Sequence, residues 1–152
     1  MTDPIAFADR THRHGLPLLF TGQAQKEAFV NEAFVRTDML LHPVVKGIRP
    51  DPPASPEAGE CWIVANPAAG SFAGREGTIA GWHAGSWHFA APVPGLRAFD
   101  LSQGLFLHYR DEWRAPDAPT LPSGGTNIDA EMRAAFMQLL ASLRTAGILS
   151  DI

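Results

Sequence analysis

The chain has 152 residues, a formal net charge of −4 and no block of like charges, which argues against nucleic-acid binding because that function needs a basic surface. It has no apolar run near the roughly 18 residues of a membrane span, and residues 1–4 (MTDP) lack the basic and apolar regions of a signal peptide. The single cysteine, Cys61, excludes an internal disulfide and is compatible with synthesis in the cytoplasm. The 14 glycines and 13 prolines are dispersed, which indicates many turns and a β-rich fold.

The N-terminal part predicts an arm followed by a helix. Residues 1–15 are polar and irregular, so we expect an extended arm that orders only against a partner. An apolar stretch at residues 16–22 leads into a helix predicted over residues 23–41, which Pro43 ends. The expected apolar stripe of this helix comprises Val30, Ala33, Phe34, Thr37, Leu40 and Leu41. Its opposite, polar side is expected to carry Glu27, Asn31 and Asp38.

The middle of the chain predicts short strands between loops. Residues 44–49 are a short strand candidate, and residues 50–59 contain four prolines, which favour a stiff surface loop. Residues 60–65 (ECWIVA) are typical of a buried strand. Residues 77–90 predict a hairpin with the two-residue turn Ala84-Gly85, which places Trp82 opposite Trp87.

A second hairpin is predicted further along. It comprises residues 105–110, a tight turn near Asp111-Glu112, and Trp113, and it is preceded by a strand candidate at residues 97–101. It repeats the order of aromatic residue, turn and tryptophan at Tyr109 and Trp113, but two copies do not indicate a repeat protein.

The C-terminal part predicts a helix after a linker. Residues 115–125 (APDAPTLPSGG) are rich in proline and glycine, and a helix is predicted over residues 128–146. Thr126 or Asn127 is the expected N-cap, and Gly147 is the expected stop. The expected apolar stripe comprises Ile128, Met132, Ala135, Phe136, Leu139, Leu140 and Leu143.

The fold class that follows is α+β: a small antiparallel β-meander or barrel-like domain with an N-terminal helix and a C-terminal amphipathic helix. The expected organisation is an extended arm (1–15), a helix with the β-domain (16–114), a linker (115–125) and the C-terminal helix (126–152).

Candidate chemistry is sparse. His83 and His88 are expected on one face of the first hairpin, opposite the indoles, where His108 could join them as a zinc ligand. No HExxH, CxxC or carboxylate cluster accompanies them, so a solvated face is favoured. Cys61 lies in an apolar strand and is expected in the core, while Glu27 and Glu32 are expected on a solvated helix face. We therefore predict no catalytic residue, no metal site, no cofactor and no enzyme activity.

The aromatic residues are the stronger signal. A meander this short cannot bury all of them on one face, so exposed indoles are expected to contact sugar rings or another protein. The candidate contact residues are Trp82, Trp87, Tyr109 and Trp113. The candidate assembly surface is the last helix, with Ile128, Met132, Phe136, Leu139, Leu140 and Leu143, which suits docking on another chain.

Four motifs occur in order along the chain: residues 16–27 (LPLLFTGQAQKE) with the NEA triplet at 31–33, the PPASP loop at 52–56, the strand at 59–64 (GECWIV) and the hairpin at 77–89 (GTIAGWHAGSWHF). Together they resemble a domain-of-unknown-function family found in alphaproteobacterial prophages and gene transfer agents. The resemblance covers about residues 16–113 and supplies no catalytic residues. It implies an appendage of a phage-like particle, similar to the base of a gene-transfer-agent head spike.

The expected function is therefore a non-enzymatic spike base or adaptor that anchors a receptor-binding fibre to the capsid or tail. The resemblance implies a capsid or tail vertex protein and a fibre protein as partners, and we expect a homo-oligomer. The chain would be made in the cytoplasm and incorporated into a virus-like particle. The alternative is a carbohydrate-binding module for cell-surface polysaccharide, since indoles beside glycine turns suit stacking on sugar rings.

Overall fold

The computed structural model describes residues 9–20, 22, 26–117, 119 and 129–149. The chain divides into two compact units, Met1–Pro92 and Val93–Ile152, and each is described by itself. In chain order the described elements are α1 (Lys26–Leu41), β1 (Val44–Val45), β2 (Ile48–Arg49), β3 (Cys61–Val64), the 3-10 helix η1 (Gly70–Phe72), β4 (Ile79–His83), β5 (Ser86–Ala90), β6 (Arg97–Asp100), β7 (Leu105–Tyr109), β8 (Trp113–Arg114) and α2 (Ala130–Thr145). The predicted α+β class is confirmed, but the strands form two sheets and neither closes into a barrel.

The first unit is built on a sheet with the strand order β2-β3-β4-β5. The sheet is mixed, because β2 pairs with β3 in parallel while the other neighbours are antiparallel. The first predicted hairpin is confirmed in its register: Trp82 faces Trp87 and His83 faces Ser86. Both turn residues, Ala84 (φ 46°) and Gly85 (φ 80°), have the positive φ that a tight two-residue hairpin turn needs.

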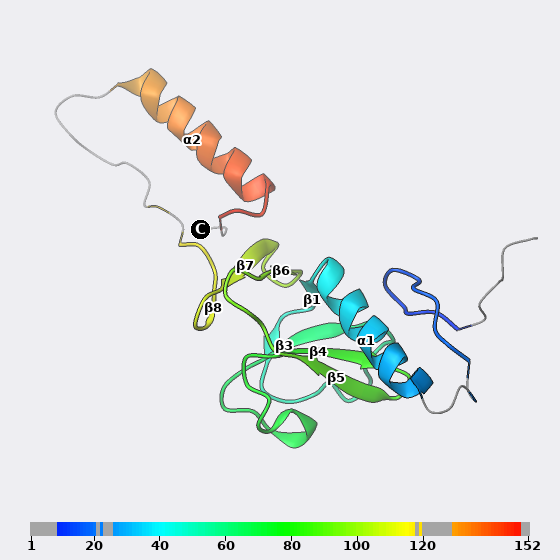
Figure 1. Cartoon of the computed structure of the whole chain (residues 1–152). Helices are drawn as coiled ribbons and strands as arrows, with labels where there is room; N and C mark the ends of the chain where they lie inside the picture. Colours follow the sequence, from blue (N-terminus) through cyan, green and yellow to red (C-terminus); the bar gives the residue numbers. More distant parts are fainter. Residues whose placement is uncertain (1–8, 21, 23–25, 118, 120–128, 150–152) are drawn as a thin grey trace, which may run out of the picture. The chain divides into compact units, whose positions relative to one another are not determined.

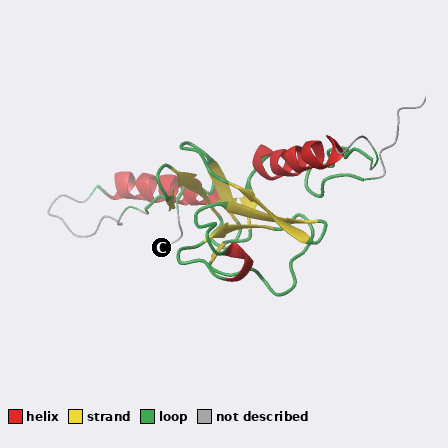
Figure 2. Ribbon diagram, turned by 60° about the horizontal axis from the view of Figure 1, so that its bottom comes forward, coloured by secondary structure: helices red, strands yellow, loops and turns green. Residues whose placement is uncertain are grey.

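The two faces of this sheet carry different side chains, because neighbouring residues of a strand point to opposite sides. Gly81 faces α1 so closely that an added methyl group would lie 2.7 Å from Met39 Sδ. Buried Ala80 faces the other side, where it forms a core with Val64 and Phe72 of η1. Both views of the molecule place α1 and η1 on opposite sides of the sheet (Figures 1 and 2).

Helix α1 buries a different side from the one that its sequence predicted. Its buried residues are Val35, Asp38 and Met39, whereas Leu41 of the expected apolar stripe is exposed. Asp38 was placed on the polar side of the helix opposite the apolar stripe, but it is buried, because the N-terminal segment covers it with hydrogen-bond donors. Residues 23–25 of the predicted helix lie outside the described residues.

The N-terminal segment, residues 9–20, lies against α1 and is held mainly by polar contacts. The Asp38 carboxylate accepts hydrogen bonds from Thr11 Oγ1 (2.7 Å), the Arg13 amide (3.0 Å) and the His14 amide (2.7 Å). Asn31 accepts from the amide of Leu19 (2.8 Å) and donates to its carbonyl (3.0 Å).

The same segment also closes the C-terminal end of α1. The Arg13 guanidinium donates to the carbonyls of Met39 (3.0 Å) and His42 (2.6 Å), where a cation suits the negative end of the helix dipole. The described part of the predicted arm is therefore structured, and residues 1–8 lie outside the described part.

The second unit contains the meander β6-β7-β8, whose neighbours are antiparallel. The predicted second hairpin is confirmed, with Tyr109 facing Trp113. Buried Asp100 at the end of β6 organises the turn that follows by accepting from Ser102 N (2.8 Å), Ser102 Oγ (2.6 Å) and Gln103 Nε2 (2.9 Å).

Helix α2 begins and ends with identifiable caps. Asp129 is the N-cap and accepts from the Met132 amide at 2.8 Å, whereas Thr126 and Asn127, the expected caps, lie outside the described residues. At the other end Gly147 adopts a φ of 68°, as its predicted role as helix stop requires, and its carbonyl accepts from Phe106 N at 2.8 Å. That bond ties the end of α2 to β7. Neither helix is long and apolar enough to cross a membrane within the described residues.

Candidate functional site

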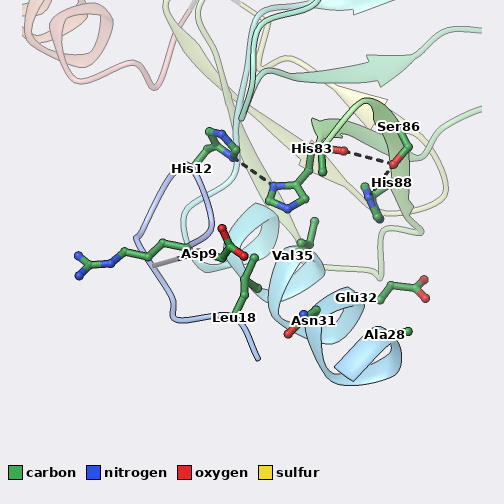
Figure 3. Close-up of a pocket in the computed structure, with 12 residues that line it drawn as sticks. Asp9, His12, Leu18, Ala28, Asn31, Glu32, Val35, His83, Ser86 and His88 are labelled. Carbon is green, nitrogen blue, oxygen red and sulfur yellow. Dashed lines mark hydrogen bonds between the residues drawn. The ribbon is translucent and has the colours of Figure 1, made fainter. Parts of the chain in front are cut away.

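The first unit contains an open cleft of about 560 Å³ between the N-terminal segment, α1 and the β4–β5 hairpin (Figure 3). Its volume falls in the range of small-molecule sites. Leu18, Ala28 and Val35 supply apolar side chains to its lining, and the remaining lining residues are mostly polar. The polar and turn residues are Asp9, Arg10, His12, Asn31, Glu32, His83, Ala84, Ser86 and His88.

Three imidazoles line one end of this cleft. His12 Nδ1 lies 3.2 Å from His83 Nδ1, within hydrogen-bond distance, and the tautomers of the two rings decide which nitrogen donates. The ring centroids of His83 and His88 lie 6.0 Å apart, and Ser86 Oγ lies 3.2 Å from His88 Nε2. The prediction that His83 and His88 share a face is confirmed, and it is His12 from the N-terminal segment that joins them.

The surroundings of His83 disfavour its charged form. Partial burial lowers the pKa of His83 below its ordinary value, and the positive charges that His12 and His88 can carry lower it further, while Asp38 acts in the opposite direction. His83 is therefore a neutral hydrogen-bonding group at pH 7. A cleft lined by imidazoles, a hydroxyl group and carboxylates can bind a polar ligand through hydrogen bonds.

His108, the residue that could have joined His83 and His88, belongs to the second unit. His108 is on β7 of the second unit, where it lines a separate cleft of about 400 Å³ with Arg110 and Arg114. Within the residues that the structure describes, no group of three or more His, Cys, Asp and Glu side chains is arranged to hold a metal ion.

Cys61 lies in the core, as its sequence context predicted. It is buried on β3, and burial raises the pKa of its thiol, with the nearby charges of Asp38 and Glu60 adding to the rise against the opposing effect of Arg13. A thiol with a raised pKa is a poor nucleophile at neutral pH.

The indoles of the first hairpin lie on the sheet face opposite the imidazoles. Trp82 and Trp87 are both half-buried, with ring centroids 5.0 Å apart. Trp87 is tied to the core by an edge-to-face contact with Phe72, also at 5.0 Å. Trp62 packs on the same core, and its Nε1 donates to Glu60 Oε1 at 2.7 Å. Trp82 is thus the less embedded member of the predicted pair.

The other two predicted contact residues belong to the second unit. Tyr109 and Trp113 form a second aromatic pair, with ring centroids 5.3 Å apart. Each hairpin therefore carries its own half-buried pair, one in each unit.

The predicted assembly surface on α2 is largely open to solvent. Met132, Phe136 and Leu139 are 68%, 38% and 53% exposed. Leu143 is half-buried, and Leu140 is only 2% exposed, so a partner cannot reach it. Ile128 lies outside the described residues.

Comparison with protein families finds a match, over residues 30–114, to a family described as a protein of unknown function, DUF2793. The chain belongs to the DUF2793 family. The matched region runs from α1 to β8, so it includes the sheet, both hairpins and most of the cleft, but it excludes α2. Comparison with curated proteins and with solved structures finds no match.

The cleft was not predicted from the sequence. It depends on His12 and Leu18 of a segment without regular secondary structure, and on the face of α1 that was expected to be solvated. The one available signal was the run of polar residues around His12, and that pattern does not indicate which helix face it contacts.

Proposed function

We propose that this chain is a non-enzymatic structural component of a phage-like particle or gene transfer agent. It serves as a spike base or adaptor that anchors a receptor-binding fibre protein to a capsid or tail vertex protein. The chain is made in the cytoplasm and becomes part of the particle. The sequence motifs of residues 16–113, which resemble those of prophage and gene-transfer-agent appendages, support the choice of particle.

The observation that carries the proposal is the exposed apolar face of α2. Large apolar side chains gathered on one side of a helix are unfavourable in water and mark a surface that contacts another molecule. This helix lies outside the DUF2793 match, and a Pro/Gly-rich stretch of sequence separates it from the meander. A family domain with its own added contact helix fits a component that is specific to one assembly.

Removal of the chain from the producing cell tests this role. Particles made without it should lack the appendage in electron micrographs, and re-expression of the full chain should restore it. Mass spectrometry of purified wild-type particles should find the chain in a fixed ratio to the major capsid protein. Particles that keep the appendage without this chain would refute the proposal.

A second candidate function is binding of cell-surface polysaccharide, and the Trp82–Trp87 pair favours it. Half-exposed indoles stack on the apolar faces of sugar rings, and a pair with centroids 5.0 Å apart offers more surface than one ring. Glycan arrays should then show binding that Trp82→Ala removes. The control is Trp62→Phe, which should retain binding. Trp62 packs on the same core, but its indole donates a hydrogen bond to Glu60 and is not part of the Trp82–Trp87 pair. An absence of binding at millimolar sugar would exclude this function.

A further inference from the structure

Helix α2 is fixed to its own unit by one side and by its C-terminal end. Leu140 is buried on that side, and an added methyl group at Gly147 would lie 2.9 Å from Phe99 Cε2 and 3.2 Å from the Gly104 carbonyl oxygen. The hydrogen bond from Phe106 N to the carbonyl of Gly147 adds a polar tie. These contacts leave a neighbouring side of the helix open.

The open side carries a regular apolar stripe. Met132, Phe136, Leu139 and Leu143 follow one another at spacings of four, three and four residues, which is the spacing of a helix-pairing seam. Three of the four are exposed, and the fourth is half-buried. We name these four residues the α2 stripe.

The composition of the open side suits close approach of a second helix. The α2 stripe itself contains no charged residue, and the two residues that flank it on the exposed side, Ala135 and Ser142, are small. Interface centres are depleted in charged residues, and small flanking side chains let two helices come near each other.

We infer that the α2 stripe pairs with the α2 stripe of a second copy of this chain, in an antiparallel arrangement with two-fold symmetry. Reversal of the helix about its midpoint places Met132 opposite Leu143 and Phe136 opposite Leu139, so apolar residues meet throughout. Such self-complementarity is what a two-fold interface requires.

The charges at the two ends of α2 favour the antiparallel orientation. Asp129 and Glu131 lie at the start of the helix, and Arg144 lies in its last turn. Antiparallel pairing puts the acidic start of each helix beside the basic end of its partner, whereas parallel pairing puts the two acidic ends together. The helix dipole, positive at the start of α2 and negative at its end, offsets part of these side-chain charges. This inference rests on the proposed structural role, and it names the partner of that surface.

Sedimentation equilibrium of the purified full chain tests the pairing, with Leu139→Lys as the disruptive variant and Met137→Lys as the matched control. Both residues are 53% exposed on α2, but Met137 lies away from the α2 stripe. The wild type and Met137→Lys should be dimers. Leu139→Lys should raise the dissociation constant at least about tenfold, because each dimer loses two buried leucines. Leu139→Ala should have a smaller effect, and it provides a second readout if the lysine unfolds the helix, which circular dichroism would reveal.

Cross-linking tests the orientation. Mixing the variants Met132→Cys and Leu143→Cys, each with one introduced cysteine, under oxidising conditions should give a disulfide between residues 132 and 143 of two copies. Native Cys61 is buried and does not compete. A predominant link between residues 132 of two copies would overturn the antiparallel arrangement.

The pairing and the proposed role fail in different ways. The pairing is overturned if the wild-type chain stays monomeric at its highest soluble concentration. It is also overturned if Leu139→Lys and Met137→Lys change the dissociation constant equally. A monomer that is still incorporated into particles leaves the structural role intact. A dimer that is absent from particles overturns the role and leaves the pairing intact.

Discussion

Replacement of Asp38 by Asn should weaken the first unit strongly while changing the side-chain volume very little. Asp38 is only 4% exposed and accepts three hydrogen bonds, two at Oδ1 and one at Oδ2. An asparagine whose NH2 group takes the place of Oδ2 keeps the two hydrogen bonds that Oδ1 accepts. Its NH2 group then faces the backbone amide of Arg13, and because both groups are donors, the third hydrogen bond cannot form. One hydrogen bond is lost and two lose their assistance from charge, so we expect a loss of about 2–3 kcal/mol in the free energy of unfolding.

Urea denaturation followed by tryptophan fluorescence measures this loss, since Trp62, Trp82 and Trp87 all report on the first unit. Trypsin provides a local readout, because release of the N-terminal segment exposes the chain after Arg13. The control is Glu32→Gln, which removes a carboxylate of the same helix from an exposed ion pair and should cost at most about 0.5 kcal/mol. If Asp38→Asn and Glu32→Gln prove equally stable, Asp38 does not anchor the segment.

Three further predictions concern single residues. Gly147→Ala should destabilise the second unit by about 2–4 kcal/mol, since the left-handed φ and the close packing both oppose a methyl group. Thermal or urea unfolding measures this loss, and a loss below about 1 kcal/mol would contradict the packing. Ala84→Asn should stabilise the first hairpin by about 0.5–1 kcal/mol, because asparagine tolerates the positive φ that Ala84 adopts, and a lower unfolding midpoint would count against it. The pKa of His83 is lower in the folded chain than in the unfolded chain, so below about pH 6.5 the unfolded chain binds more protons at this residue. The free energy of unfolding that the chain has at pH 7 should therefore fall on acidification. The urea midpoint should fall less between pH 7.5 and 5.5 in His83→Gln than in the wild type, because the variant lacks the imidazole whose protonation is disfavoured in the folded chain. An equal fall in both proteins would exclude His83 as the cause of the pH dependence.

Local signals determined much of the fold. The register of the first hairpin follows from the Ala84-Gly85 turn, because a two-residue turn leaves only one pairing for Trp82 and Trp87. Gly147 ends α2 as predicted, since its left-handed conformation is available to glycine at little cost. Such features depend on residues that are close in sequence, and composition and spacing therefore reveal them.

Long-range contacts account for what the sequence did not predict. The buried side of α1 could not be derived from its apolar periodicity, because Asp38 is buried by backbone donors of a segment far from it in the chain. The three-histidine end of the cleft depends on that same contact, as His12 reaches His83 across 71 positions. His108 was considered beside His83 and His88 only on the condition that its strand was adjacent, and it lies on β7 of the other unit.

The alternation of side chains along the first hairpin links two surfaces that differ in chemistry. His83 and His88 line the cleft beside α1, while Trp82 and Trp87 lie on the face that η1 covers in part. An insertion of one residue within β4 would exchange these sets, driving imidazoles into the Phe72 core and indoles against α1. Substitutions on one face therefore leave the other surface in place, whereas a shift of register along β4 alters both surfaces at once.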